Sequence, residues 1–386
     1  MRINELSLYL NLIKLSSRYR VIVLFTGSWL LASWAFAQKS SPMADSVSLP
    51  QQPARRTLLV LPLVARSIET AWSFGVASSL TFRLTDDSTT RTSNTQAIAL
   101  YSLRRQFVVA LNGATYFPGE RYILNHQLSY SYFPDKFWGL GKDAPERAVE
   151  NYTFRQYYIY LHLQRQLKAN RFVGLLYEFQ RVMDVDYRDG GLFEQQDVPG
   201  RKPYHVSGAG LSYTYDSRTS AFSPDQGALL QVQFNHFAPL LGSDFQYTNY
   251  VLDARTFRRV GRRQVLALQA YAFLNSGYVP LRSLASFGGS NSMRGYYDGR
   301  YRDRNQAVVQ AEYRTDLFWR LGAVVFGGIG NVAYNVNELN LRHLKFAYGA
   351  GLRVAVNPKE RLNLRIDYGF GGTTGSGLYF QLGEAF

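Results

Sequence analysis

The sequence contains no cysteine. This absence excludes a disulfide framework, a thiolate metal site, a cysteine nucleophile and a lipid-anchored N-terminal cysteine. The five histidines form no H-x-x-x-H or H-x-H pair, and no group of acids has metal-ligand spacing. A P-loop, a dinucleotide fingerprint and a G-x-S-x-G motif are also lacking. We therefore expect no cofactor and no enzymatic activity; the enzyme alternative is a lipid hydrolase whose serine and histidine meet only in the fold.

Long hydrophobic runs are scarce, and the one that exists is N-terminal. Two arginines precede an apolar stretch over 21–37 that ends in Ala-Phe-Ala. A basic region, an apolar core and a small-x-small triplet are typical of a secretory signal peptide, which we expect over 1–37. The alternative is a membrane anchor, but the run is short for a transmembrane helix. The polar, Pro/Ser/Gln-rich stretch 38–56 predicts a short periplasmic linker.

Acidic residues are few beside the basic ones. The chain carries 28 Asp and Glu against 43 Lys and Arg, a formal net charge of +15. A basic balance can indicate nucleic-acid binding, but an exported protein rarely meets nucleic acid. We expect contact with anionic outer-membrane lipids, including lipopolysaccharide, and no nucleic-acid partner.

Residues 57–386 show period-2 alternation, in stretches of about 10–14 residues separated by turn residues. In 361–370, for example, apolar side chains alternate with Arg361, Asn363, Arg365 and Asp367. A soluble β-sandwich also alternates, but these stretches are near the length that a tilted strand needs to cross a bilayer. Tight and long connections also alternate, which is the asymmetry expected of an outer-membrane barrel.

Fifteen such strands are evident, and a parity argument adds one more. Fifteen strands would leave the two ends of the barrel on opposite sides of the membrane, whereas both are expected in the periplasm. The apolar run 57–66 is the natural first strand, with Pro62 tolerated near a strand end or edge. We predict an all-β, transmembrane, antiparallel up-and-down β-barrel of about 16 strands over 57–386, in the bacterial outer membrane. The expected strands are 57–66, 72–83, 95–104, 106–117, 121–133, 154–167, 171–186, 206–217, 228–237, 244–259, 264–277, 306–319, 322–335, 345–356, 361–370 and 377–386.

The most unusual stretch is SFGGSNSMRGYYDGRYRDRNQAVVQAEYR, over 286–314. Here the chain resembles the BamA/TamA family of outer-membrane assembly barrels, also called bacterial surface antigens. Their long extracellular loop folds into the lumen and carries an Arg-Gly-aromatic triplet after a Gly-Gly-Ser-like lead. The matching residues are Arg294, Gly295 and Tyr296, with Glu312 on the following strand.

Three further motifs carry the resemblance, in the family's order. A periplasmic-turn element matches at Tyr215, Asp216, Arg218, Pro224 and Gly227. The penultimate strand carries an inward acid, here Asp367. A C-terminal insertion signal places one face of the last strand at Leu378, Phe380, Leu382 and the terminal Phe386, with Gly383 between.

Charge and parity support a role for Arg294 as a latch. An arginine on a loop folded into a lumen needs a carboxylate to offset its desolvation. Asp367 and Glu312 both fall on the inward parity of their strands, so we predict that Arg294 pairs with Asp367, and that Glu312 is the second candidate. The alternative is that Arg294 is one of many solvated lumen arginines. Gly295 allows close backbone approach or a positive φ, and Tyr296 can pack against the barrel wall.

The sequence departs from the family in two ways. Gly328 stands where the family commonly places an aspartate. Family members also usually carry periplasmic POTRA modules, and the stretch 38–56 is too short to hold one. The resemblance implies a barrel that helps to insert or translocate proteins, or lipids, through a weak seam between its first and last strands. We expect a periplasmic partner chain to capture clients; the alternative is a passive channel or structural barrel.

Overall fold

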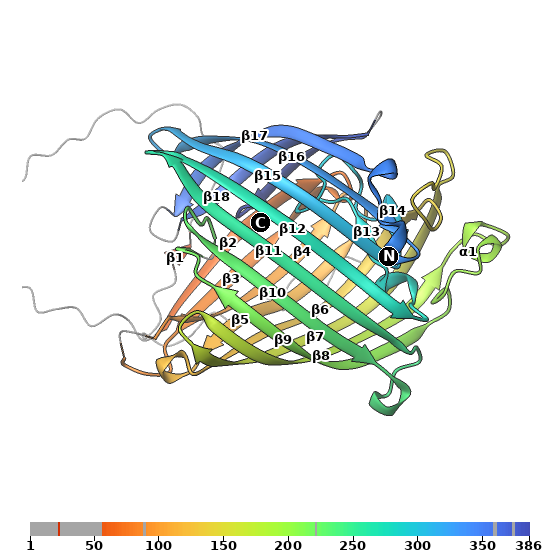
Figure 1. The fold of residues 1–386 in the computed structure, drawn as a ribbon, viewed down its shortest axis with the longest axis horizontal. Coiled ribbons are helices and arrows are strands. Elements are labelled where there is room, and N and C mark those ends of the chain that lie inside the picture. The colour runs from red at the N-terminus through yellow and green to blue at the C-terminus, as the bar shows by residue number, and fades with distance from the viewer. Residues whose placement is uncertain (1–21, 24–55, 88–89, 221, 358–360, 373–374) are drawn as a thin grey trace, which may run out of the picture.

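The computed structural model describes residues 22–23, 56–87, 90–220, 222–357, 361–372 and 375–386, and its architecture is a barrel (Figure 1). Sixteen strands, β2–β12 and β15–β19, form one antiparallel sheet in which successive barrel strands are neighbours and β19 returns to β2. The prediction of an up-and-down barrel of about 16 strands is confirmed. Among the described residues, no helix has the length and apolarity needed to span a membrane.

The bounds of the barrel strands follow the alternating pattern closely. They are β2 (Arg56–Ser67), β3 (Ala71–Phe82), β4 (Ser93–Ser102), β5 (Phe107–Tyr116), β6 (Tyr122–Phe137), β7 (Glu150–Lys168), β8 (Arg171–Asp186), β9 (Tyr204–Asp216), β10 (Gly227–Phe237), β11 (Tyr247–Gly261), β12 (Gln264–Gly277), β15 (Asn305–Phe318), β16 (Leu321–Ala333), β17 (Lys345–Asn357), β18 (Leu362–Gly371) and β19 (Gly375–Leu382). The other elements are β1 (Ile22–Val23), β13 (Ala285–Phe287), β14 (Tyr301–Asp303), α1 (Leu192–Gln195) and the 3-10 helices η1 (Pro118–Glu120), η2 (Pro239–Leu241), η3 (Leu281–Ser283), η4 (Val336–Glu338) and η5 (Leu341–His343).

Two predictions concern the ends of the chain. The expected last strand, 377–386, instead ends at Leu382. The expected signal peptide (1–37) and linker (38–56) lie outside the described residues, except for β1 and Arg56. β1 pairs in parallel with Leu59 and Val60 of β2.

The barrel wall is apolar outside and polar inside. On β7, Leu161 and Leu163 are exposed on the outer face, whereas His162 and Gln164 between them are buried inward. This alternation matches a wall that faces lipid on one side and a lumen on the other, because neighbouring side chains of a strand point to opposite faces. The long wall strands β6, β7 and β8 have 16, 19 and 16 residues, whereas β18 and β19 have 10 and 8.

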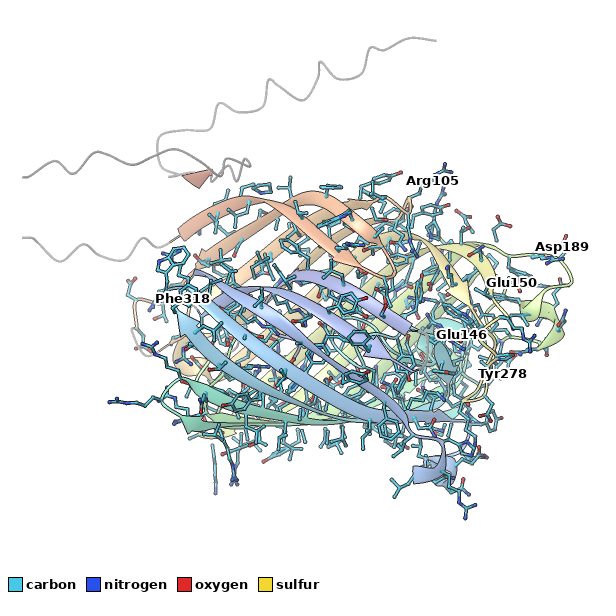
Figure 2. The ribbon with its side chains drawn as sticks, turned by 90° about the horizontal axis from the view of Figure 1, so that it is seen from above. Arg105, Glu146, Glu150, Asp189, Tyr278 and Phe318 are labelled. Carbon is cyan, nitrogen blue, oxygen red and sulfur yellow. The ribbon has the colours of Figure 1, made fainter. Side chains whose placement is uncertain are left out.

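The two ends of the barrel differ. The turn end carries two-residue turns at 169–170, 262–263 and 319–320, and the opposite loop end carries the longest connections. Figure 2 shows Phe318 at the turn end and Asp189 and Tyr278 at the loop end. The loop end is closed by a buried, mostly aromatic core: Phe137, Tyr152, Phe154, Val182, Phe193, Val198, Tyr204, Val206, Phe237, Tyr247, Val279, Leu281 and Leu284.

Candidate functional site

The connection between β12 and β15, residues 278–304 and here called the latch loop, enters the lumen and brings Arg294 between two strands. One guanidinium nitrogen of Arg294 lies 2.5 Å from Asp367 Oδ2 on β18. The other bonds Glu312 Oε1 on β15. Arg294 is 1% exposed and both carboxylates are fully buried. The structure therefore brings the arginine of the triplet together with the two acids that parity had selected, and each acid offsets part of the desolvation of the arginine.

Three more arginines complete this buried cluster. Arg314 lies 2.6 Å from Glu312 Oε2, and Arg353 lies 2.5 Å from Asp367 Oδ1. Arg365 is farther, 3.8 Å from Asp367 Oδ2, and donates to Asn291 Oδ1 of the latch loop at 2.7 Å. Each acid thus has two arginine partners within 2.6 Å, so neither depends on Arg294 alone. The sequence analysis did not single out these arginines as partners, although Arg314 and Arg365 share the inward parity of Glu312 and Asp367.

The ring of Phe326 contacts Arg294 from β16, the strand on which Gly328 stands where the family commonly has an aspartate. The Arg294 guanidinium carbon lies 3.5 Å from the centroid of the Phe326 ring. Phe326 and Gly328 share one face of β16, and a side chain at Gly328 would begin 3.1 Å from the sulfur of Met293. The glycine therefore leaves room for the latch loop, and a cation–π contact stands beside Arg294. Sequence reasoning missed Phe326, whose parity with Gly328 was the available signal.

Gly295 and Tyr296 fix the rest of the triplet against the last two strands. Gly295 has a φ of 111°, and a Cβ there would lie 2.3 Å from the backbone of Phe370. Only glycine fits this approach. Its N–H donates to Tyr379 Oη on β19 at 2.9 Å. The Tyr296 ring packs edge-on against Phe287 at 5.4 Å, and burial raises the pKa of its hydroxyl to about 12.

The junction of β19 with β2, here called the seam, is held by one paired position, Phe380 with Arg66. Gly383 has a φ of 87° and directs the chain inward after Leu382. In the observed register, a continued strand would bring 383–386 alongside 60–63 of β2. The inward turn therefore leaves most of the β2 edge without a partner from β19.

The prediction that Phe386 shares the outer face of the last strand is wrong. Leu378, Phe380 and Leu382 are on β19, but Phe386 is buried with Ala385 against Phe257 and Ala267 of the facing wall. Arg314 donates to the Phe386 carbonyl oxygen at 3.0 Å, and Glu384 pairs with Arg353 at 2.7 Å. These inward contacts replace the ladder hydrogen bonds that a continued strand would have made.

The latch loop contacts both sides of the seam. On one side it reaches β19 through the bond from Gly295 to Tyr379. On the other, the Asp298 N–H donates to Glu69 Oε1 at 2.8 Å, in the turn between β2 and β3. Burial raises the pKa of the Glu69 carboxyl. The loop therefore bridges two strands that hardly pair with each other.

The predicted periplasmic-turn motif forms a compact element at the turn end. The Arg218 guanidinium donates two hydrogen bonds, of 2.9 and 3.0 Å, to the carboxylate of Asp216, which follows Tyr215 at the end of β9. Gly227 has a φ of 98°, and Pro224 is buried. The adjoining Asp225, missed by the sequence analysis, accepts from Arg361 across the barrel mouth at 2.8 Å, and this bond lowers the pKa of Asp225.

Other chemistry in the lumen is incomplete. His162 Nε2 lies 2.6 Å from Ser212 Oγ, both buried in the wall. In the described part of the chain, no carboxylate forms an ion pair with His162, so this pair has no third member to orient the imidazole. No group of three or more potential metal ligands occurs among the described residues.

Comparisons with known proteins agree with this geometry. The Omp85 superfamily domain matches residues 73–386. The fold is similar to BamA from Haemophilus ducreyi lacking POTRA domains 1–3, with a TM-score of 0.56 and 13% identity, covering 85% of this chain and 70% of that one. It is also similar to CdiB from Escherichia coli (TM-score 0.58, 14% identity, 87% and 63% covered) and CdiB from Acinetobacter baumannii (0.57, 13%, 85% and 59%). The chain thus spans about three fifths of each CdiB. No curated protein matches the sequence.

Proposed function

Because the chain belongs to the Omp85 superfamily and is an outer-membrane barrel, we propose that it helps to insert or translocate proteins, or lipids, through the seam between β19 and β2. Barrels of this superfamily insert or translocate clients and are not enzymes. The turn end faces the periplasm, and the loop end faces the outside.

The observation that carries the proposal is the single pairing at the seam. A strand edge without partners is a template for another strand. Ten residues of β2, Arg56–Ala65, have no partner on β19, and only Leu59 and Val60 of these pair with β1 among the described residues. A client strand can therefore add to the rest of this edge by β-augmentation. Opening there breaks far less backbone pairing than opening elsewhere in the wall.

The latch loop controls how far the seam opens. It holds β19 through Tyr379 and the β2–β3 turn through Glu69, while Arg294 anchors its middle in the buried charge cluster. A shift of the loop therefore acts on both edges at once. This arrangement gives the resemblance-based role of Arg294 a physical basis.

A passive channel is the weaker alternative. The aromatic core at the loop end is buried, and the latch loop occupies the lumen beside β15, β18 and β19. A wide, steady pore needs a water-filled passage, so we expect the purified barrel to show no steady conductance in planar bilayers.

A periplasmic partner chain supplies client capture in this proposal. The similar chains are longer than this one, which covers 59–70% of them. Outer-membrane lipids, including lipopolysaccharide, surround the apolar wall. The partner is testable by crosslinking from the turn end.

A disulfide lock tests the seam directly, because the chain has no native cysteine. The variant Arg66→Cys/Phe380→Cys places two thiols at the paired position, where antiparallel Cα atoms lie within disulfide range. In cells that contain this variant as their only copy of the protein, oxidation should deplete other folded outer-membrane proteins or surface lipids. A reductant should restore them.

The matched control is Leu128→Cys/Ile159→Cys, an outward-facing pair in register on β6 and β7. This lock joins strands that are already paired along their length, so activity should persist. Equal loss with both locks, or with neither, would contradict a mobile seam.

A further inference from the structure

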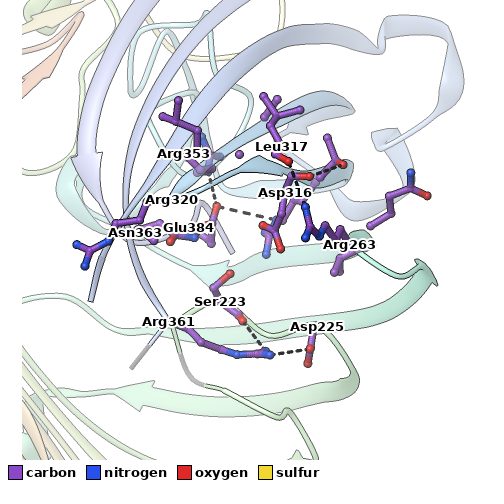
Figure 3. A pocket seen from close by; sticks show the side chains of 18 of the residues that line it. Ser223, Asp225, Arg263, Asp316, Leu317, Arg320, Arg353, Arg361, Asn363 and Glu384 are labelled. Carbon is purple, nitrogen blue, oxygen red and sulfur yellow. Dashed lines mark hydrogen bonds and ion pairs between the residues drawn. The ribbon is translucent and has the colours of Figure 1, made fainter. Parts of the chain in front are cut away.

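A cavity of about 560 Å³ opens at the turn end of the barrel, between the β15–β16 turn and the segment around Asp225 (Figure 3). Figure 3 shows Arg361 joined to Asp225 on one side and Arg353 joined to Glu384 on the other. Seven arginines and three carboxylates line the cavity, an excess of four positive charges. Such an excess in a partly enclosed space attracts an anion.

Two of these arginines are buried with unused donors. Arg314 and Arg353 are 7% and 5% exposed, and their atoms Nη1 and Nη2, respectively, have no hydrogen-bond partner in the described structure. The two guanidinium groups flank one oxygen of Glu384, at 3.9 and 2.7 Å. Buried N–H groups without acceptors are costly. An anion that takes the place of the Glu384 carboxylate would accept from both guanidinium groups.

The rim of the cavity is apolar and exposed. Leu317 and Phe318 end β15, Trp319 begins the turn to β16, and Trp319 is 85% exposed. Aromatic side chains at a barrel end are typical of the headgroup level of a bilayer. The cavity therefore offers arginines inside and an apolar rim beside the lipid.

We infer that this cavity binds a phosphate group, carried by a phospholipid headgroup or present as free phosphate. A phosphate has several acceptor oxygens, which suits two converging guanidinium groups better than a single carboxylate does. The rim favours the lipid as the source. This inference does not rest on the proposed transport function.

Native mass spectrometry of the full chain in detergent tests the site with phosphatidic acid and with diacylglycerol of the same acyl chains. We expect retention of phosphatidic acid only. Arg314→Lys and Arg353→Lys keep the charge next to Glu312 and Asp367 but remove the unused N–H, and each should weaken binding at least about fivefold. Arg255→Lys, at a lumen arginine that pairs with Asp253 outside the cavity, should bind like the unchanged chain.

Competition with inorganic phosphate separates the two sources. Displacement at similar concentrations would assign the site to free phosphate, and resistance to displacement would assign it to the lipid headgroup; both support the inference. If either lysine variant fails to fold, Arg262→Gln/Arg320→Gln at the cavity mouth serves as the second test. Equal retention of diacylglycerol or unchanged binding in folded variants would overturn the inference. Binding of a polyglutamate peptide that phosphate does not displace would also overturn it.

Discussion

The wall formed by β6 and β7 and the seam formed by β19 and β2 are made of the same kind of alternating strand. β6 pairs with β7 along all 16 of its residues, whereas β19 pairs with β2 at one position. Both regions present apolar side chains outward, so residue preference does not explain the difference. The cause is the course of the chain, because β19 is short and turns inward at Gly383. Membrane insertion depends on apolar side chains on the outer face of each strand. Closure of the barrel also depends on the first and last strands being long enough to pair.

A cation on the outer face should have its largest effect at the seam. Phe380→Arg places a charge on the lipid face of β19 at a cost of up to about 2–4 kcal/mol, and we expect loss of insertion. Leu161→Arg makes the same kind of change on β7, which pairs along most of its length on both sides, and should still insert. Heat-modifiable mobility of the outer-membrane fraction measures both. Equal insertion would show that the seam is no weaker than the wall.

Next in size is the loss of an acid from the buried cluster. Asp367→Asn leaves Arg294, Arg353 and Arg365 short of one negative charge and should cost about 3–5 kcal/mol. Arg294→Ala should cost less, about 1.5–3 kcal/mol, because Glu312 keeps Arg314 and Asp367 keeps Arg353. The temperature at which heat-modifiable mobility is lost gives the order of the two variants. The reverse order would mean that the stability of the cluster depends more on Arg294 than on Asp367. In both variants the latch loop should become more sensitive to protease.

A substitution at the inward turn should make the seam resemble the wall. Gly383→Val disfavours the positive φ by about 1–2 kcal/mol and favours a strand that continues beside β2. Amide hydrogen exchange of 58–65 should then slow. Gly242→Val is the control, since that glycine has a similar φ of 82° and open space around it but lies at the loop end. Unchanged exchange in the Gly383 variant would show that the inward turn at Gly383 is not what keeps the seam open.

An effect confined to one hydrogen bond concerns the tie between the latch loop and β19. Tyr379→Phe removes the acceptor of the Gly295 N–H and should cost about 1–3 kcal/mol, because the donor stays buried. Tyr368→Phe loses a hydroxyl contact with Ser376 on the exposed face and should cost under about 1 kcal/mol. Limited proteolysis of the latch loop would report the difference. Equal cleavage of both variants would show that the Tyr379 hydroxyl does not hold the latch loop in place.

The sequence by itself determined the barrel and part of the latch. Period-2 alternation and parity led to sixteen strands, because lipid and lumen impose opposite faces on each strand. The same parity directed Asp367 and Glu312 inward, where only a cation can offset their desolvation. These inferences are local, since a side chain's face depends on its place in its own strand.

The tertiary structure alone decided where the chain leaves its strand and which charges meet. The apolar alternation predicted a strand to Phe386, but contacts of Glu384 with Arg353 and of Phe386 with Phe257 and Arg314 come from distant strands. The bridge from Asp298 to Glu69 likewise joins residues far apart along the chain. No local pattern encodes these contacts, because their energies depend on burial and on partners that only the closed barrel brings together.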